Sequence, residues 1–176
     1  MNVYKLTLLA IFAALGVAGR LVLVYVPNVQ PASALIIVCG LMLGPLSAVI
    51  LAFLIAFLSN MLLGVGIWTI WQIFAWSLIG LISGWIGKYP RKIPLIIMML
   101  FGIFCGYFYG FVISLTSYQI TGQFFLAYYL AGLPYDTYHA IGNAVFILLL
   151  YPILQRFTKK YAKHRFPIQD TNMNKE

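Results

Sequence analysis

The sequence predicts an all-α integral membrane protein: a bundle of six transmembrane helices with both chain ends in the cytoplasm. Three observations predict this fold. Of the 176 residues, 63% are hydrophobic and only 8% are charged, whereas roughly a quarter of the residues in a soluble domain are charged. Apolar runs repeatedly exceed the roughly 20 residues that cross a bilayer. The basic residues follow directly after such runs, as in the cytoplasmic loops of membrane proteins.

Gly, Pro and polar residues between the apolar runs place the helices. We expect them at about 4–26, 32–43, 46–64, 70–87, 94–117 and 134–156. The second and third are separated only by Gly44-Pro45, where Gly can end one helix and Pro can begin the next. The count of six spans depends on this turn, and five spans remain the alternative.

The distribution of Lys and Arg predicts the orientation. Segments 88–92 and 156–163 are separated by two predicted spans and therefore lie on one side, the cytoplasm. With six spans, Lys5 lies on that side too. The segments on the opposite side, 27–33, 65–70 and 118–133, contain no Lys or Arg. We predict one transmembrane domain over residues 1–165 and a polar tail over 166–176.

Polar and aromatic side chains gather at the predicted outer side, in three loops, the third with Gln119, Thr121 and Gln123, and at two helix ends. The candidate ligand-binding residues among them are Asn28, Gln30, Asn60, Trp68, Thr69, Trp71, Gln72, Asp136, Tyr138 and His139. Amides hydrogen-bond to polar edges and aromatic rings stack on flat ligands, so the sequence predicts an outward-facing pocket for a small molecule. For any single Trp or Tyr, an interfacial aromatic belt is the alternative.

Arg20 is the only basic residue well inside a predicted span. A charge at such depth is rare unless it is paired or functional. The expected partner is Asp136, the only acidic residue before the tail. Arg20 could contact the ligand or could only neutralise Asp136, and the sequence leaves both interpretations open.

Asp136 and His139 are three residues apart and could share a helix face, as acid–base chemistry in a small membrane enzyme would require. We expect neither a metal nor another cofactor, because no further His, Cys or carboxylate is predicted at that depth. The chain also lacks a phosphate-binding loop and is not expected to hydrolyse ATP. A channel is disfavoured because the polar residues crowd the outer third of the predicted bundle.

Ala10, Ala14 and Ala18 recur every four residues along the first predicted helix. Such spacing produces a smooth helix face that another helix can approach closely. Packing within the chain and docking of a partner protein both fit this pattern.

Together these features resemble the substrate-binding membrane subunits, or S-components, of energy-coupling factor (ECF) vitamin transporters. The likeness is carried by Ala10-x-x-x-Ala14, by the Pro-Asn-Val-Gln-Pro loop at 27–31, by GLMLGP at 40–45 and by SNMLLGVGIWTIWQIFA at 59–75. It covers residues 4–160. The loop at 27–31 and the Trp-Thr-Ile-Trp-Gln stretch are most similar to cobalamin-type members, whereas pantothenate and pyridoxine-type subunits share the architecture.

The resemblance implies a binding subunit without its own ATPase in the bacterial plasma membrane. It implies that the subunit captures a vitamin, with cobalamin the first expectation, in a cavity facing outward. It further implies that Ala10, Ala14 and Ala18 dock onto a transmembrane coupling protein driven by two cytoplasmic ATPases. The docked subunit would then topple in the membrane to open its site inward.

Overall fold

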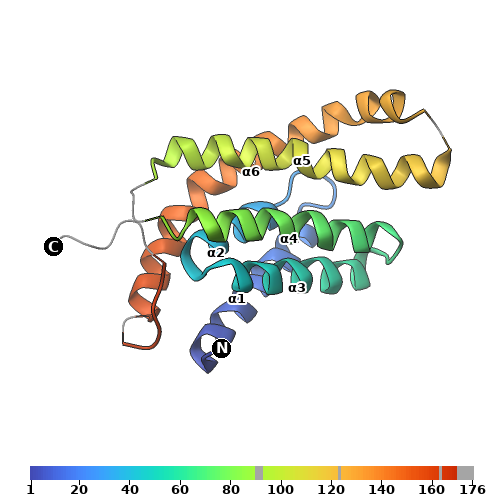
Figure 1. The fold of residues 1–176 in the computed structure, drawn as a ribbon. Coiled ribbons are helices and arrows are strands. Elements are labelled where there is room, and N and C mark those ends of the chain that lie inside the picture. The colour runs from blue at the N-terminus through green and yellow to red at the C-terminus, as the bar shows by residue number, and fades with distance from the viewer. Residues whose placement is uncertain (90–92, 123, 163, 170–176) are drawn as a thin grey trace.

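The computed structural model describes residues 1–89, 93–122, 124–162 and 164–169, which form an all-helical bundle (Figure 1). Arg91, Lys92 and the tail from residue 170 onward, which the sequence analysis placed in the cytoplasm, lie outside the described residues, as does Gln123 of the third predicted outer loop. The helices are α1 (Val3–Val22), α2 (Ala32–Leu43), α3 (Pro45–Leu63), α4 (Trp68–Ile86), α5 (Leu95–Thr121) and α6 (Phe125–Ala162).

Five of the described helices are long and apolar enough to cross a membrane, and α2 is the exception. Its 12 residues rise only about 18 Å, whereas the hydrocarbon core of a bilayer is roughly 30 Å thick. Every residue of α2 is buried, and α2 packs against all five other helices. The multi-pass helical membrane fold is therefore established, while the second of the six predicted spans corresponds to a short central helix.

The prediction of a loop over residues 118–133 is wrong for most of that range, because α5 continues to Thr121 and α6 begins at Phe125. The prediction took Pro134 as a helix start, but Pro134 lies inside α6, as does Pro152. A Pro inside a helix removes a backbone hydrogen bond and favours a kink. Figure 1 shows α6 changing direction along its length.

Three glycines bring α5 and α6 into close contact. A Cβ at Gly106 would lie 2.6 Å from the Cα of Ala140, and one at Gly110 would lie 2.0 Å from the Asp136 carboxyl carbon. A Cβ at Gly102 would lie 2.4 Å from Cδ1 of Ile147. This spacing of small residues at every fourth position is the usual device for close helix packing in membranes. It fixes the register of the two longest helices.

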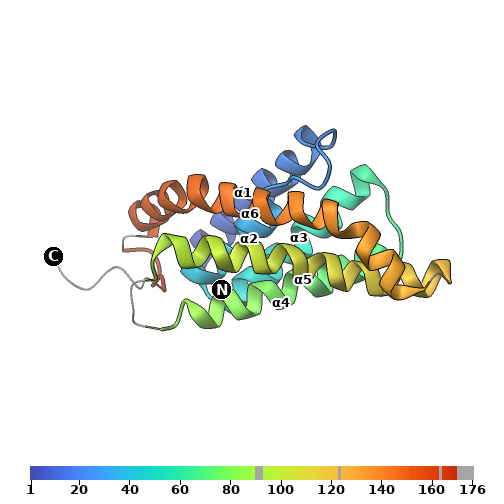
Figure 2. The ribbon, with the colours of Figure 1, turned by 90° about the horizontal axis from the view of Figure 1, so that it is seen from above.

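The connections between helices define two ends of the bundle. The α1–α2, α3–α4 and α5–α6 connections lie toward one end, which we call the pocket end. The turn at Gly44, the start of α1 and the last turns of α6 lie toward the other, which we call the basic end (Figures 1 and 2). The basic end carries Lys159 and Lys160 in the last turn of α6.

Candidate functional site

The short α2 leaves room inside the pocket end. Near the start of α2, Ser33 accepts a hydrogen bond from the indole N–H of Trp76, at 2.9 Å. Trp76 lies eight residues after the first residue of α4, so α2 begins about two helical turns below the start of α4. The connection between α1 and α2 therefore descends into the bundle before α2 begins.

A cavity of about 210 Å³ opens beside this connection. Its lining combines one cation, two amides and a phenol ring with aliphatic side chains. The lining residues are Arg20, Leu23, Val24, Val26, Asn28, Val29, Gln30, Leu63 and Tyr109. Apolar walls with a few convergent polar groups are typical of small-molecule sites.

Arg20 is the central polar group of the cavity. Its Nε donates to Gln30 Oε1 at 2.8 Å, and its Nη1 donates to Asn60 Oδ1 at 3.1 Å and to Ser59 Oγ. The guanidinium also lies over the Trp76 ring, 5.2 Å from its centroid. Several uncharged acceptors and an aromatic face thus hold this cation at membrane depth.

The expected pair between Arg20 and Asp136 does not form among the described residues. Arg20 turns toward acceptors on the α1–α2 connection and the end of α3 instead. Asp136 packs against the α5 backbone at Gly110. It is only 5% exposed, and its Oδ2 has no hydrogen-bond partner within the described part of the chain. The cation beside the cavity is therefore not neutralised by this carboxyl group.

A chain of side-chain hydrogen bonds supports Arg20 from behind. Asn60 Nδ2 donates to Thr69 Oγ1 at 3.0 Å and to Gln72 Oε1 at 2.7 Å. Gln72 Nε2 then donates to the Tyr109 hydroxyl at 2.7 Å. Asn60, Thr69 and Gln72 are all buried. Because a fully paired polar network is rigid, it fixes both Arg20 and the Tyr109 ring at the cavity wall.

Tyr109, which lines the cavity, stacks with two further aromatic rings. Trp76 and Tyr109 stack with centroids 5.4 Å apart, and Tyr109 and His139 stack at 5.1 Å. The carbonyl of Asn28 can only accept, so His139 Nδ1 donates to it, at 3.1 Å. Ser33 accepts from Trp76 and offers its hydroxyl proton to His139 Nε2, at 2.9 Å. Both ring nitrogens of His139 are thus engaged.

The α1–α2 connection is fastened to α6 through Asn28. Besides accepting from His139, Asn28 donates from its side-chain amide to the Tyr135 carbonyl at 3.0 Å. Its backbone is left-handed, with φ of 55°, a conformation that Asn tolerates better than most residues. Next to it, Val29 packs against Gly142, where a Cβ would lie 3.4 Å from Val29. These contacts shape one wall of the cavity.

The structure divides the predicted site residues into three groups. Arg20, Asn28 and Gln30 line the cavity, whereas Asn60, Thr69, Gln72 and His139 support it from behind. The remaining predicted residues lie away from the cavity lining. Trp68 is 50% exposed and folds over Gly66, Trp71 packs on Phe74, Tyr138 is 52% exposed, and Asp136 is buried against α5.

Sequence reasoning missed three residues of the site: Ser33, Trp76 and Tyr109. Each lies inside an apolar run, where an aromatic ring or a hydroxyl is indistinguishable from ordinary packing. A usable signal is the spacing of Thr69, Gln72 and Trp76, which places all three on one face of α4. That face would have extended the predicted pocket from the loop into the helix.

Fold and site together define a class, that of a helical membrane protein with a cavity lined by convergent polar groups. Comparison with known families makes the assignment specific: a family model described as "ECF-type riboflavin transporter, S component" matches residues 1–156. The chain belongs to this family and is a vitamin-binding, non-enzymatic subunit of an ECF transporter. Searches of curated proteins and of solved structures gave no match. The predicted S-component class is confirmed, and the predicted cobalamin subtype is not.

Proposed function

We propose that this S-component captures riboflavin, or a close flavin, in the cavity beside Arg20 and delivers it to an ECF transport module. One observation carries the proposal: the family match coincides with a cavity whose polar groups suit a flat heteroaromatic ring. The isoalloxazine ring of a flavin presents carbonyl oxygens and ring nitrogens as acceptors. Arg20 and the amide of Asn28 supply donors, and Tyr109 adds an aromatic group to the lining.

The size and charge of the cavity, taken together with the family match, favour a flavin over the other vitamins considered. At about 210 Å³, the cavity lies below the roughly 300–1,000 Å³ of typical ligand pockets. A corrinoid such as cobalamin is far larger than a flavin and would demand a much wider opening of the α1–α2 connection. Pantothenate offers a carboxylate for Arg20 but no aromatic ring. Pyridoxine is small enough for the cavity, so the family match rather than size favours a flavin over pyridoxine.

Residues outside the cavity lining enter the proposal in supporting roles. Asn60, Thr69, Gln72 and His139 position the groups that touch the vitamin. Trp68 and Tyr138 are half exposed at the pocket end, where the part of a ligand that projects from the cavity would reach them. Trp71 and Asp136 act through packing against neighbouring helices.

The alanine face of α1 is the proposed docking surface for the coupling protein. Ala10, Ala14 and Ala18 are all exposed. Together with Leu54 and Leu58 of α3, this face lines an apolar groove of about 450 Å³. The groove is open to a partner helix, and small residues let helix backbones approach closely. Two cytoplasmic ATPases bound to the coupling protein would supply the energy that this chain does not generate.

The proposal places the basic end in the cytoplasm and the pocket end outside, in a bacterial plasma membrane. Its support is the charge distribution: Lys5 lies at the start of α1, Lys88 follows α4, and Lys159 and Lys160 lie in the last turn of α6, whereas the pocket-end connections contain no Lys or Arg. Both chain ends would then be cytoplasmic. With α2 counted as the second membrane segment, the chain would cross as predicted.

The alternative of a small enzyme using Asp136 and His139 receives less support from the geometry. Both nitrogens of His139 are engaged by Ser33 and Asn28, and a general base needs a free nitrogen directed at its substrate. Asp136 faces the backbone of α5 rather than the cavity. Turnover of a bound ligand, rather than its release unchanged, would favour the enzyme.

The test is calorimetry on the purified protein without ATP. The panel contains riboflavin, flavin mononucleotide, cobalamin, pantothenate and pyridoxine. We expect one flavin molecule to bind per chain, and the other three vitamins to give no heat at the same concentrations. Tight cobalamin binding would restore the cobalamin-type assignment, and silence across the whole panel would refute the vitamin site.

A further inference from the structure

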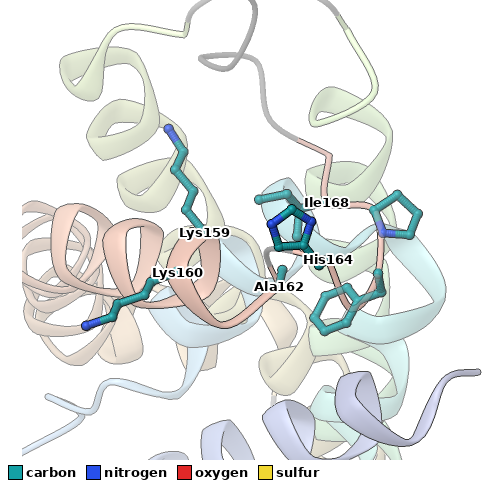
Figure 3. Close-up of a pocket in the computed structure, with 7 residues that line it drawn as sticks. Lys159, Lys160, Ala162, His164 and Ile168 are labelled. Atoms are coloured by element: carbon teal, nitrogen blue, oxygen red, sulfur yellow. The ribbon is translucent and has the colours of Figure 1, made fainter.

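We infer that the basic end carries a binding cleft for the headgroup of an anionic phospholipid. The cleft, of about 590 Å³, is lined by Lys159, Lys160, Ala162, His164, Phe166, Pro167 and Ile168 (Figure 3). It is independent of the vitamin cavity, which lies at the opposite end of the bundle. Phe166, Pro167 and Ile168 give it an apolar wall, and Lys159 and Lys160 border it with their ammonium groups directed outward (Figure 3), so an acyl chain in the cleft would have its phosphate beside these cations.

The cleft is formed by a reversal of the chain after α6. Arg165 N and Phe166 N both donate to the carbonyl of Ala162, at 2.8 and 3.3 Å. His164 adopts a left-handed backbone with φ of 66°. The chain therefore turns back beside the last turn of α6, and Phe166 and Ile168 pack partly against the core. The cleft lies between this returning segment and the helix end.

Contacts with three other parts of the bundle hold the returning segment in place. Arg165 lies between two rings, 4.5 Å from the Tyr161 centroid and 5.2 Å from that of Tyr4. Asn2 Nδ2 donates to the Arg165 carbonyl at 2.9 Å. Gln169 N donates to the Met42 carbonyl at the end of α2, at 2.7 Å. A cleft fixed at both ends is preformed, which lowers the entropic cost of binding.

The position of the cleft along α6 identifies a lipid, rather than a soluble anion, as the occupant. Leu149, Ile153 and Phe157 are 54%, 62% and 44% exposed and recur every four residues, which makes one apolar stripe on the outside of the bundle. The cations begin immediately after this stripe, at Lys159 and Lys160. A stripe facing acyl chains that ends in cations marks the boundary between hydrocarbon and headgroups.

Native mass spectrometry of the full-length protein in neutral detergent tests this assignment. The probes are dioleoyl phosphatidylglycerol, dioleoyl phosphatidylcholine and sn-glycerol 3-phosphate. We expect phosphatidylglycerol to bind at least about five-fold more tightly than phosphatidylcholine, because each basic residue near an anionic headgroup contributes about that factor. We expect glycerol 3-phosphate, which lacks acyl chains, to leave no adduct at the same concentration.

Two variants locate the site. Lys160→Gln should lower phosphatidylglycerol affinity about five-fold, since Lys160 is exposed and its replacement leaves the fold intact. The matched control is Lys88→Gln, which removes an equally exposed lysine outside the cleft lining. Equal affinity for the two lipids, or equal losses of affinity in both variants, would overturn the assignment of the cleft as a lipid-headgroup site. Binding of glycerol 3-phosphate as tightly as the lipid would overturn the lipid as its occupant.

Discussion

Two arginines make the same kind of contact at opposite ends of the bundle. Arg20 lies 5.2 Å from the Trp76 centroid, and Arg165 lies 4.5 Å from that of Tyr161. Arg20 also donates to side chains from the α1–α2 connection and from α3. Arg165 is exposed and donates along α6 to the Tyr161 carbonyl, at 3.1 Å.

The difference in surroundings sets the expected role of each arginine. A cation over an exposed ring gains about 0.5–1 kcal/mol, whereas a desolvated one gains about 2 kcal/mol or more. Arg20 lines a cavity and is fixed by a network that ends at Tyr109. Arg165 only holds the returning segment against Tyr4. We therefore propose that the enclosed arginine serves a ligand site, whereas the open arginine fastens the returning segment.

Removing Arg20 should give the largest difference between the two arginines. Arg20→Met should weaken riboflavin binding about 10- to 100-fold, because a hydrogen bond to a charged group is worth about 1.5–3 kcal/mol. Calorimetry on the purified variant measures the loss. Arg165→Met is the matched control and should leave riboflavin affinity within about two-fold, as expected for a residue outside the site. Equal affinities in the two variants would show that the enclosed arginine has no special role.

A second test concerns the outer face of the helix that carries Arg20. Ala14→Trp should reduce recovery of the coupling protein at least about ten-fold in co-purification, because the indole fills the groove between α1 and α3. Riboflavin affinity should not change. Leu15→Trp serves as the control, since Leu15 is exposed but lies outside that groove. If the Ala14 variant assembles normally, the alanine face is not the docking surface.

A smaller effect should follow from interrupting the network behind Arg20. Gln72→Leu removes the acceptor for Asn60 and the donor for Tyr109. These two hydrogen bonds act on the ligand only through Arg20 and Tyr109, so we expect a loss of about 1 kcal/mol in binding, which weakens riboflavin affinity about five-fold. Its neighbour Trp71 packs on Phe74, so Trp71→Phe should leave affinity unchanged in the same assay. A larger loss in the Trp71 variant would move the site away from the cavity.

The smallest effect is expected at the open arginine. Arg165→Met should lower the melting temperature by about 2–4 °C, which corresponds to about 1 kcal/mol in a chain of this size. Thermal unfolding in detergent, followed by circular dichroism, measures the shift. A decrease of more than about 10 °C would mean that the returning segment stabilises the whole bundle rather than one end of it.

The fold was predictable from the sequence where long apolar runs coincide with single helices, as in α3 and α4. Errors arose where a local signal competes with tertiary packing. Pro134 suggested a helix start, but contacts with the glycine face of α5 carry α6 through it. The length of α2 was predicted, but its complete burial and its recess below α4 depend on all the surrounding helices.

The site was predictable to the extent that polar residues stand out against an apolar background. Arg20, Asn28 and Gln30 were predicted as ligand contacts in this way, and all three line the cavity of the candidate site. Trp76 could be identified only through its spacing from Thr69 and Gln72. Tyr109 has no such signal, because inside a span only the rotation of the helix decides whether a ring faces a ligand or a neighbouring helix. The prediction of an Arg20–Asp136 pair was wrong for a related reason, because opposite charges in a sequence do not specify the distance between the two side chains in the fold.

The measurement that tests the central claim most directly is protection of the cavity from a thiol reagent. Val26 lines the cavity and is 45% exposed, and the native Cys39 and Cys105 are buried. In Val26→Cys, riboflavin at ten times its Kd should slow labelling by N-ethylmaleimide about ten-fold, in proportion to the unoccupied fraction. Val65→Cys, in the exposed α3–α4 connection, should label at the same rate with and without riboflavin. Unchanged labelling of the Val26 variant at saturating riboflavin would contradict a vitamin site beside Arg20.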